Sequence, residues 1–286
     1  MRSATFELHL ANLILSGALL FTRWIDAPVP VLIVGRCVIG ALFLGLFLAY
    51  EKPEFSGGWP LWMCGIIMAL HWVTFFWAGR LSSIGVAMVA MYTYPVMTAL
   101  AEPIVEKGRM AAGPDLLLAA LATLGVTILG FNSSAVALSG LLLGVLSAAL
   151  ITTRNLLVRH RLGTANPSMI MYAQLIIAGL ALSPALFFYD YKLNVQDLLF
   201  WLLLGAIFTA LAHTLFVRAL QRMRASSAGI IASIQPVYSA ILAFLFFREV
   251  PDGWFYLGGG LVVLASILES WRSQQVVASK DVVQAQ

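Results

Sequence analysis

Charged residues are scarce in this chain of 286 residues: they make up 10% of the sequence, whereas hydrophobic residues make up 61%. A soluble domain carries about 25% charged residues, because its surface must face water. So much apolar surface cannot be hidden in one water-soluble core, and the mean hydropathy of +0.92 leads to the same conclusion. The sequence therefore predicts an all-α, polytopic membrane protein in contact with the lipid bilayer.

Cysteine is also rare, since only Cys37 and Cys64 occur and both lie inside apolar runs. Two such residues form neither a disulfide framework nor a metal-ligand cluster. The sequence has no Walker-type phosphate loop, no serine nucleophile elbow and no basic-aromatic surface for nucleic acid. We therefore expect no cofactor, no metal and no nucleic-acid partner, and an ATP-driven pump is excluded on this chain alone.

Acidic residues are missing from the centres of the apolar runs, because all 13 of them lie at or near run ends. A carboxylate inside a membrane is costly and usually marks a proton or sodium pathway. Its absence disfavours a carboxylate-based proton pump and a membrane-embedded hydrolase with an acid/base pair. We expect a protein that is not an enzyme.

Ten apolar runs follow one another along the chain, each close to the roughly 20 residues that a helix needs to cross a hydrocarbon core. Short connections with turn or charge signals separate them, and the polar tail at 272–286 is predicted to be disordered. The runs lie at about residues 8–25, 29–50, 60–79, 84–104, 112–131, 137–158, 168–188, 197–219, 225–247 and 253–271.

Basic residues divide unevenly between the two sides of these runs. If the N-terminus is cytoplasmic, twelve Lys and Arg residues, Arg154 among them, fall on the cytoplasmic side and four on the other, with Arg36 left inside the second run. Positive residues concentrate in cytoplasmic loops. The sequence therefore predicts a multi-pass protein of the cell inner (plasma) membrane with both termini in the cytoplasm.

A proline-centred motif occurs twice, with an offset of 141 residues. Met91-Tyr92-Thr93-Tyr94-Pro95-Val96 corresponds to Ala232-Ser233-Ile234-Gln235-Pro236-Val237, each inside an apolar run. Proline removes an N–H group and crowds the carbonyl four residues earlier, so Pro95 and Pro236 are predicted hinges. We expect two five-helix repeats, residues 1–132 and 133–271. The odd number of spans inverts the second repeat relative to the first, which is the standard architecture for alternating access.

Two histidines lie deep in apolar runs, and an unperturbed histidine side chain titrates near neutral pH. His71 is about halfway along the third run, and His213 is deep in the eighth. Each is either a neutral ring that is hydrogen-bonded inside the bundle or part of a substrate cavity. In the second case, Thr74, Phe75 and Ala78 share the helical face of His71 and would line the cavity with it.

Arg36 is the most costly residue in the predicted spans, since a charge near a span centre costs about 2.5–3.5 kcal/mol on insertion scales. It either pairs with backbone carbonyls or a neighbouring helix, or it anchors a substrate carboxylate through its guanidinium fork.

Other polar side chains at mid-span either join helices by hydrogen bonds or line a central cavity. A cavity flanked by two kinked helices suits a ligand with an aromatic or aliphatic body and a small polar head. These further candidate substrate-binding residues are Tyr92, Tyr94, Asn155, Gln174, Ser233, Gln235 and Tyr238. The Gly140-x-x-x-Gly144 spacing suits packing within one chain and could also support dimerisation, so we expect a monomer or weak homodimer.

The chain resembles the EamA-like branch of the drug/metabolite transporter superfamily over about residues 8–271. The resemblance rests on Arg36 in the second run, Ala87 through Tyr94-Pro95-Val96 in the fourth, and Ala228 through Gln235-Pro236-Val237 with Arg248-Glu249 in the ninth. It implies ten membrane helices as two inverted five-helix repeats. The combination around His71, Tyr92 and Tyr94 is similar to the aromatic amino acid exporter branch.

This resemblance implies an exporter of small amphipathic metabolites, most simply aromatic or other hydrophobic amino acids, working by alternating access. Facilitated diffusion is favoured over proton antiport, since no carboxylate is expected at mid-span. The alternatives are a drug or lipid extruder of the same superfamily, a channel, and an integral-membrane enzyme.

Overall fold

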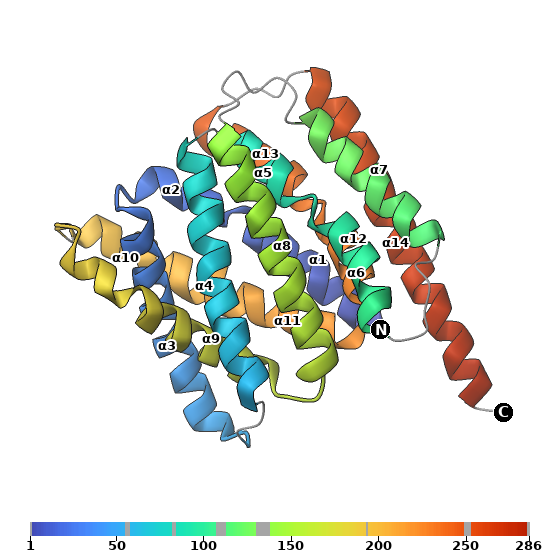
Figure 1. The fold of residues 1–286 in the computed structure, drawn as a ribbon, viewed down its shortest axis with the longest axis horizontal. Helices are drawn as coiled ribbons and strands as arrows, with labels where there is room; N and C mark the ends of the chain where they lie inside the picture. The colour runs from blue at the N-terminus through green and yellow to red at the C-terminus, as the bar shows by residue number, and fades with distance from the viewer. Residues whose placement is uncertain are drawn as a thin grey trace.

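The computed structural model describes residues 2–54, 58–81, 84–106, 113–129, 138–192, 194–248 and 253–284, and over these residues every regular element is a helix (Figure 1). The elements are α1 (Arg2–Ser16), η1 (Ala18–Leu20), α2 (Phe21–Trp24), α3 (Val29–Glu51), α4 (Gly58–Leu81), α5 (Ile84–Met91), α6 (Tyr94–Val105), α7 (Gly113–Leu129), α8 (Leu138–Arg161), α9 (Pro167–Leu182), η2 (Ser183–Phe187), α10 (Val195–Gly205), η3 (Ala206–Leu211), α11 (Ala212–Arg222), α12 (Ala225–Ala232), α13 (Gln235–Phe247) and α14 (Gly253–Gln284).

Local chemistry accounts for several helix ends. The Asn166 side chain accepts hydrogen bonds from two backbone N–H groups in the first turn of α9, and Asn194 accepts one from the Asp197 N–H at the start of α10. Lys52 and Arg248 adopt left-handed backbone conformations directly after α3 and α13. These caps provide partners for peptide groups that a helix end would otherwise leave open.

Each of the ten apolar runs is mainly helical over its described residues. By length and composition, six described helical stretches are able to cross a membrane: Val29–Glu51, Gly58–Leu81, Leu138–Arg161, Pro167–Phe187, Val195–Arg222 and Ala225–Phe246. The other four runs contain shorter or interrupted helices or, for α14, a helix that continues into polar sequence. The structure therefore confirms an all-helical membrane protein, while ten complete spans stay a prediction.

The end of α14 differs from the sequence-based expectation. Residues 272–284, predicted to be a disordered tail, continue α14 as a helix to Gln284. No proline or glycine occurs between Leu261 and Gln284, so the sequence contains neither of the two residues that most readily end a helix. The predicted boundary between the two repeats, at residues 132 and 133, lies outside the described residues.

Both proline motifs break a helix at the positions predicted from the sequence. The chain turns at Tyr92 and Thr93 between α5 and α6, and the turn between α12 and α13 comes 141 residues later. Pro95 and Pro236 each occupy the second position of the new helix, where a missing N–H group costs little. Both prolines are buried, so neither faces the surroundings of the bundle.

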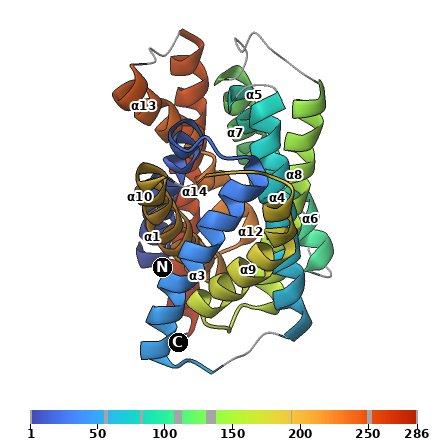
Figure 2. The same ribbon diagram turned by 90° about the vertical axis from the view of Figure 1, so that its left-hand side faces the viewer.

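Many of the helices pack side by side as pairs (Figure 2). Cys64 contacts Arg154 and His71 contacts Ser147, so α4 and α8 run antiparallel. α4 packs against α8, and α1 packs against α11, which is the same pair shifted by 141 residues with the roles of the two halves exchanged. Contacts of α7 with α14 join Asp115 to Arg272 at one end and Gly125 to Gly258 at the other, so these helices run antiparallel. α3 and α9 also pack side by side.

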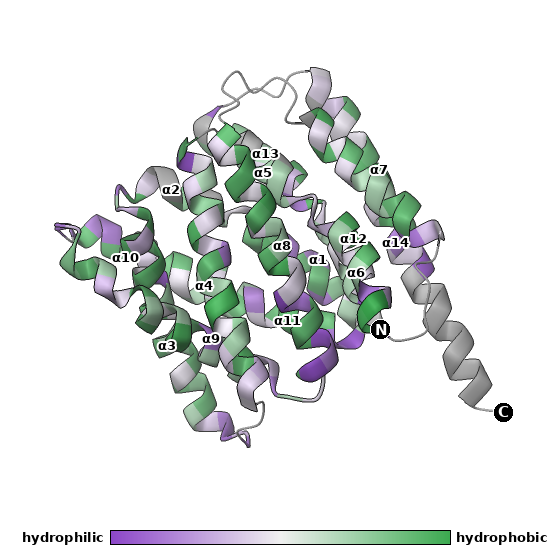
Figure 3. Ribbon diagram, viewed as in Figure 1, coloured by the Kyte–Doolittle hydropathy of each residue, from purple (hydrophilic) through white to green (hydrophobic). Residues whose placement is uncertain are grey.

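The outer surface is apolar, whereas much of the polar chemistry is inside. Figure 3 shows hydrophobic colour along the helix bodies and hydrophilic colour gathered mainly near helix ends. Large hydrophobic side chains such as Leu46, Trp62 and Leu142 are exposed, while Arg36 and Arg154 are buried. An exposed apolar surface of this extent indicates contact with lipid.

Candidate functional site

A cavity with a volume of ≈ 100 Å³ lies between the two broken helices. A water molecule needs roughly 10–15 Å³ on this scale, so the cavity has room for several waters or a small ligand. Its lining comes from both halves of the chain: Leu15, Ser16, Ala18, Arg36, His71, Trp72, Phe75, Phe76, Met88, Met91, Tyr92, Tyr94, Ile151, Arg154, Asn155, His213, Phe216, Gln235 and Ser239.

Arg36 enters this cavity from α3 and is only 2% exposed. Its Nε donates a 3.0 Å hydrogen bond to Oγ1 of Thr209. The guanidinium carbon lies 4.4 Å from the centre of the Trp72 ring and 5.7 Å from that of Phe76. Cation–π contacts and one hydroxyl thus hold the guanidinium group, and none of these partners carries a negative charge.

Thr209 owes its position to a π-helical turn, η3, which joins α10 to α11. The Thr209 hydroxyl donates a 2.6 Å hydrogen bond to the Leu204 carbonyl and accepts the bond from Arg36. Such turns occur frequently at functional sites, because they shift side chains out of α-helical register. Here the turn directs a polar group toward the guanidinium of α3.

Arg154 is a second buried guanidinium in the cavity lining, with 1% exposure. Its Nε and Nη2 donate to Oε1 of Gln174 at 3.1 Å and 2.9 Å, and its Nη1 donates to Oδ1 of Asn155 at 3.0 Å. Two neutral amides therefore fix the orientation of this guanidinium. Gln174 comes from α9, so the contact also joins α8 to α9.

His71 is held in a defined orientation by α8. Its Nδ1 lies 3.1 Å from the Ser147 carbonyl, which can only accept, so Nδ1 carries a proton in this contact. The Ser147 hydroxyl lies 2.8 Å from the same nitrogen. The His71 ring is parallel to that of Phe75, with 6.1 Å between centroids.

His213 approaches the same cavity from α11 and forms an edge contact with Trp72 at 5.6 Å between centroids. Arg36 and Arg154 both lie close enough to the two histidines to act on them electrostatically. The lining is thus cationic at its polar end and aromatic along its walls.

The structure brings eight of the predicted residues to the cavity lining: Arg36, His71, Phe75, Tyr92, Tyr94, Asn155, His213 and Gln235. Five others lie outside that lining: Thr74, Ala78, Gln174, Ser233 and Tyr238. Thr74 and Ser233 bond to backbone carbonyls of their own helices, and Gln174 acts on the cavity only through Arg154. Substrate binding by any of these residues stays a prediction.

Arg154 lines the cavity but was not among the predicted site residues, because it was counted among the cytoplasmic basic residues. α8 continues to Arg161, which leaves Arg154 about two turns inside the helix. The adjacent Asn155 was the available signal, since a buried guanidinium needs amide or carboxylate acceptors nearby. Glu249, part of the family resemblance, lies outside the described residues.

A cluster of charged residues lies at one end of the bundle, away from the cavity; we refer to it as the ionic cluster. Asp115 of α7 accepts hydrogen bonds from Arg224 and Arg272, and Arg272 also bonds Glu269. Glu102 accepts the N–H groups of residues 225 and 226 at the start of α12, at 2.7 Å and 3.0 Å. The cluster joins α6, α7, α12 and α14 by paired charges.

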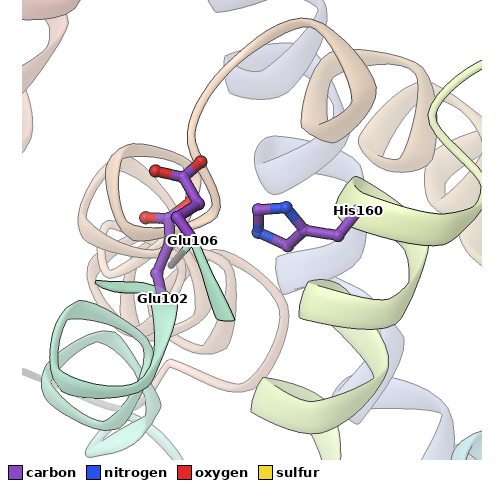
Figure 4. Close-up of side chains that lie close together, drawn as sticks. All are labelled: Glu102, Glu106 and His160. Carbon is purple, nitrogen blue, oxygen red and sulfur yellow. The ribbon is translucent and has the colours of Figure 1, made fainter. Parts of the chain in front are cut away.

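Among the described residues, one group has the spacing of possible metal ligands: Glu102, Glu106 and His160, whose ligand atoms lie within 4.8 Å of one another (Figure 4). The two oxygens of Glu102 already accept backbone hydrogen bonds at the start of α12. Arg224 also lies 3.8 Å from that carboxylate. The group therefore fits a structural role at the helix start better than a metal centre.

The comparisons with known proteins agree with a membrane transporter. Residues 138–271 match the model of the EamA-like transporter family. A solved structure titled "Crystal structure of protein" has a TM-score of 0.82 to this chain at 17% identity, covering 94% of this chain and 98% of the other, which shows a shared fold. No curated protein matches the sequence.

Proposed function

We propose that this chain, whose residues 138–271 match the model of the EamA-like transporter family, exports small amphipathic metabolites that have an apolar body and a carboxylate. The family supports a multi-pass membrane transporter of the drug/metabolite type. Aromatic or other hydrophobic amino acids are the substrates that the sequence favours. The observation that carries the proposal is the cavity between the two proline breaks, lined by aromatic rings and two guanidinium groups.

Recognition in this proposal divides between the two kinds of lining. Trp72, Phe75 and Phe216 offer apolar faces to the substrate body, and Arg36 offers N–H donors to its carboxylate. Small-molecule sites commonly combine an apolar wall with a few oriented polar groups.

Transport would proceed by alternating access, with residues 1–132 rocking against 133–271 around the cavity. Contacts between the two proline breaks support this mechanism. The Tyr94 hydroxyl donates a 3.3 Å hydrogen bond to the Gly229 carbonyl, and a Cβ on Gly229 would lie 3.4 Å from Cα of Pro95. The antiparallel pairs related by 141 residues further support two inverted repeats. A change in the bend at Pro95 or Pro236 would then displace residues of the other half through these contacts.

Facilitated diffusion is the simplest form of coupling, because no carboxylate is present among the described residues that line the cavity. Proton exchange through His71 is the alternative. An imposed pH gradient should drive substrate flux in a proton exchanger but not in facilitated diffusion. In the proposed topology the protein lies in the inner membrane as a monomer or weak homodimer with both termini cytoplasmic.

Reconstitution of the purified chain into liposomes tests this proposal. A panel of labelled aromatic and aliphatic metabolites, with and without a pH gradient, should show saturable flux of some members. His71→Ala should reduce that flux, whereas His9→Ala, a matched control outside the cavity lining, should not. Absence of flux for the whole panel would contradict a transport function, and unaltered flux in His71→Ala would remove His71 from the site.

A further inference from the structure

The charges of the cavity are unbalanced. Arg36 and Arg154 are both buried in its lining, and their hydrogen-bond partners in the described structure are Thr209, Gln174 and Asn155, all of them neutral. None of the described lining residues is an aspartate or a glutamate. Two guanidinium charges therefore face a small, largely aromatic space with no resident anion to balance them.

Two partly buried arginines elsewhere in the chain are paired with carboxylates. In the ionic cluster, Arg224 and Arg272 share Asp115, and Arg272 also binds Glu269. A buried charge without a counter-charge is costly, so unpaired charges persist mainly at sites that act on ions or ligands. The contrast between the two pairs of arginines indicates that the counter-charge of Arg36 and Arg154 comes from outside the protein.

We propose that the cavity binds a small organic anion with net negative charge: an acid group, such as a carboxylate or sulfonate, on an aromatic or aliphatic body without an ammonium group. This refines the substrate class of the proposed function and rests on it. The acid group binds between Arg36 and Arg154, and the body packs against the rings of Trp72, Phe75 and Phe76.

The positive charge of the cavity disfavours binding of the ammonium group of an α-amino acid. The ammonium and the carboxylate are attached to the same carbon atom, so an amino acid that places its carboxylate between the guanidiniums must place its ammonium beside them. Like charges repel strongly in a low-dielectric site. The described cavity lining has no carboxylate to compensate, and its neutral acceptors provide only dipoles.

Three probes with the same phenyl ring test this inference on the purified full-length protein by titration calorimetry. L-Phenylalanine has both charged groups, 3-phenylpropanoate lacks the ammonium, and 2-phenylethylamine lacks the carboxylate. We expect 3-phenylpropanoate to bind roughly tenfold or more tightly than phenylalanine, and the amine to show no binding. Equal or tighter binding of phenylalanine would overturn the inference.

Transport of 2-phenylethanesulfonate into liposomes is the matching functional test. A sulfonate stays ionised at all working pH values, so it does not cross the bilayer unaided and its uptake reports the protein. Saturable uptake that 3-phenylpropanoate inhibits supports the inference. If the liposomes transport phenylalanine but neither anion, the inference fails while the proposed export function stands; if no solute is transported, the proposed function itself fails.

Arginine variants test whether anion binding depends on the guanidinium groups of Arg36 and Arg154. Arg36→Gln should weaken 3-phenylpropanoate binding by roughly tenfold or more, because Gln keeps a polar side chain but removes the charge. Arg161→Gln is the matched control, since Arg161 is exposed at the end of the same helix as Arg154. Arg36→Lys should bind better than Arg36→Gln but less well than wild type, because Lys keeps the charge and loses the fork.

Arg154→Gln should weaken binding similarly, but it also removes the contacts to Gln174 and Asn155. Thermal unfolding of each variant shows whether it folds. Should Arg154→Gln not fold, Arg36→Gln and the three wild-type probes still decide the question. Undiminished anion binding in folded Arg36→Gln would overturn the assignment.

Discussion

A close contact between α8 and α5 gives a sharp test of the packing around the cavity. A Cβ atom placed on Gly144 would lie 2.4 Å from Cβ of Ala90 and 3.4 Å from the Ala87 carbonyl oxygen. Carbon atoms in contact prefer about 3.5–4.0 Å. Gly144→Ala must therefore push the two helices apart by about 1 Å, because Cβ of Ala90 is fixed to its backbone and cannot rotate away.

Overpacking of this kind costs about 1–3 kcal/mol. We expect Gly144→Ala to lower the midpoint of thermal unfolding by several degrees, measured on purified protein in one detergent. Transport should fall as well, since α5 ends at Met91, which lines the cavity.

Gly260→Ala is the matched control, because no heavy atom lies within 4 Å of a Cβ at this exposed position of α14. It should be neutral or should stabilise the protein by up to ~1 kcal/mol, since alanine is the better helix former. The reasoning is refuted if Gly144→Ala unfolds at or above the wild-type midpoint, or if the two variants are destabilised equally.

Three further substitutions test separate features. Asp115→Asn leaves Arg224 and Arg272 without their shared carboxylate and should lower the free energy of unfolding by about 2 kcal/mol. This is less than for a fully buried pair, because the two arginine side chains are 22% and 27% exposed. Wild-type stability in thermal unfolding would argue against an ionic role. Pro95→Ala restores an N–H group and favours joining α5 to α6, so initial efflux at matched expression should slow; an unchanged rate would exclude a hinge at this position. Asn166→Ala removes the cap of α9 and should cost about 1 kcal/mol, whereas Asn166→Ser should retain most of the stability; equal midpoints for the two would contradict capping.

The helices and their breaks could be predicted from the sequence because both depend on local chemistry. An apolar run of sufficient length forms a helix in a membrane whatever its neighbours are. Pro95 and Pro236 interrupt their helices through a missing N–H group, which is a property of the residue itself. For this reason the two turns appear where the 141-residue offset places them.

The polar site could be predicted only in part, because it depends on partners from other helices. Arg154 lies near the end of the predicted run 137–158 and was counted with the cytoplasmic basic residues, and its acceptor Gln174 is on a different helix. The π-helical turn that directs Thr209 toward Arg36 has no recognisable sequence signal. Tertiary contacts therefore decide which of the polar mid-helix residues reach the cavity.

The charged residues of the ionic cluster are not repeated at the positions related to them by the 141-residue offset. Shifted by 141 residues, Asp115, Arg224 and Glu269 correspond to Tyr256, Ser83 and Ile128, none of which is charged at neutral pH. In the proposed alternating-access cycle, opening at the end that contains the cluster must separate paired ions, whereas opening at the far end separates none among the residues that the structure describes. Each ~1.4 kcal/mol of this difference shifts the occupancy of two conformers tenfold. Without substrate, the protein should therefore populate mainly the conformer whose cavity opens at the end without the ionic cluster.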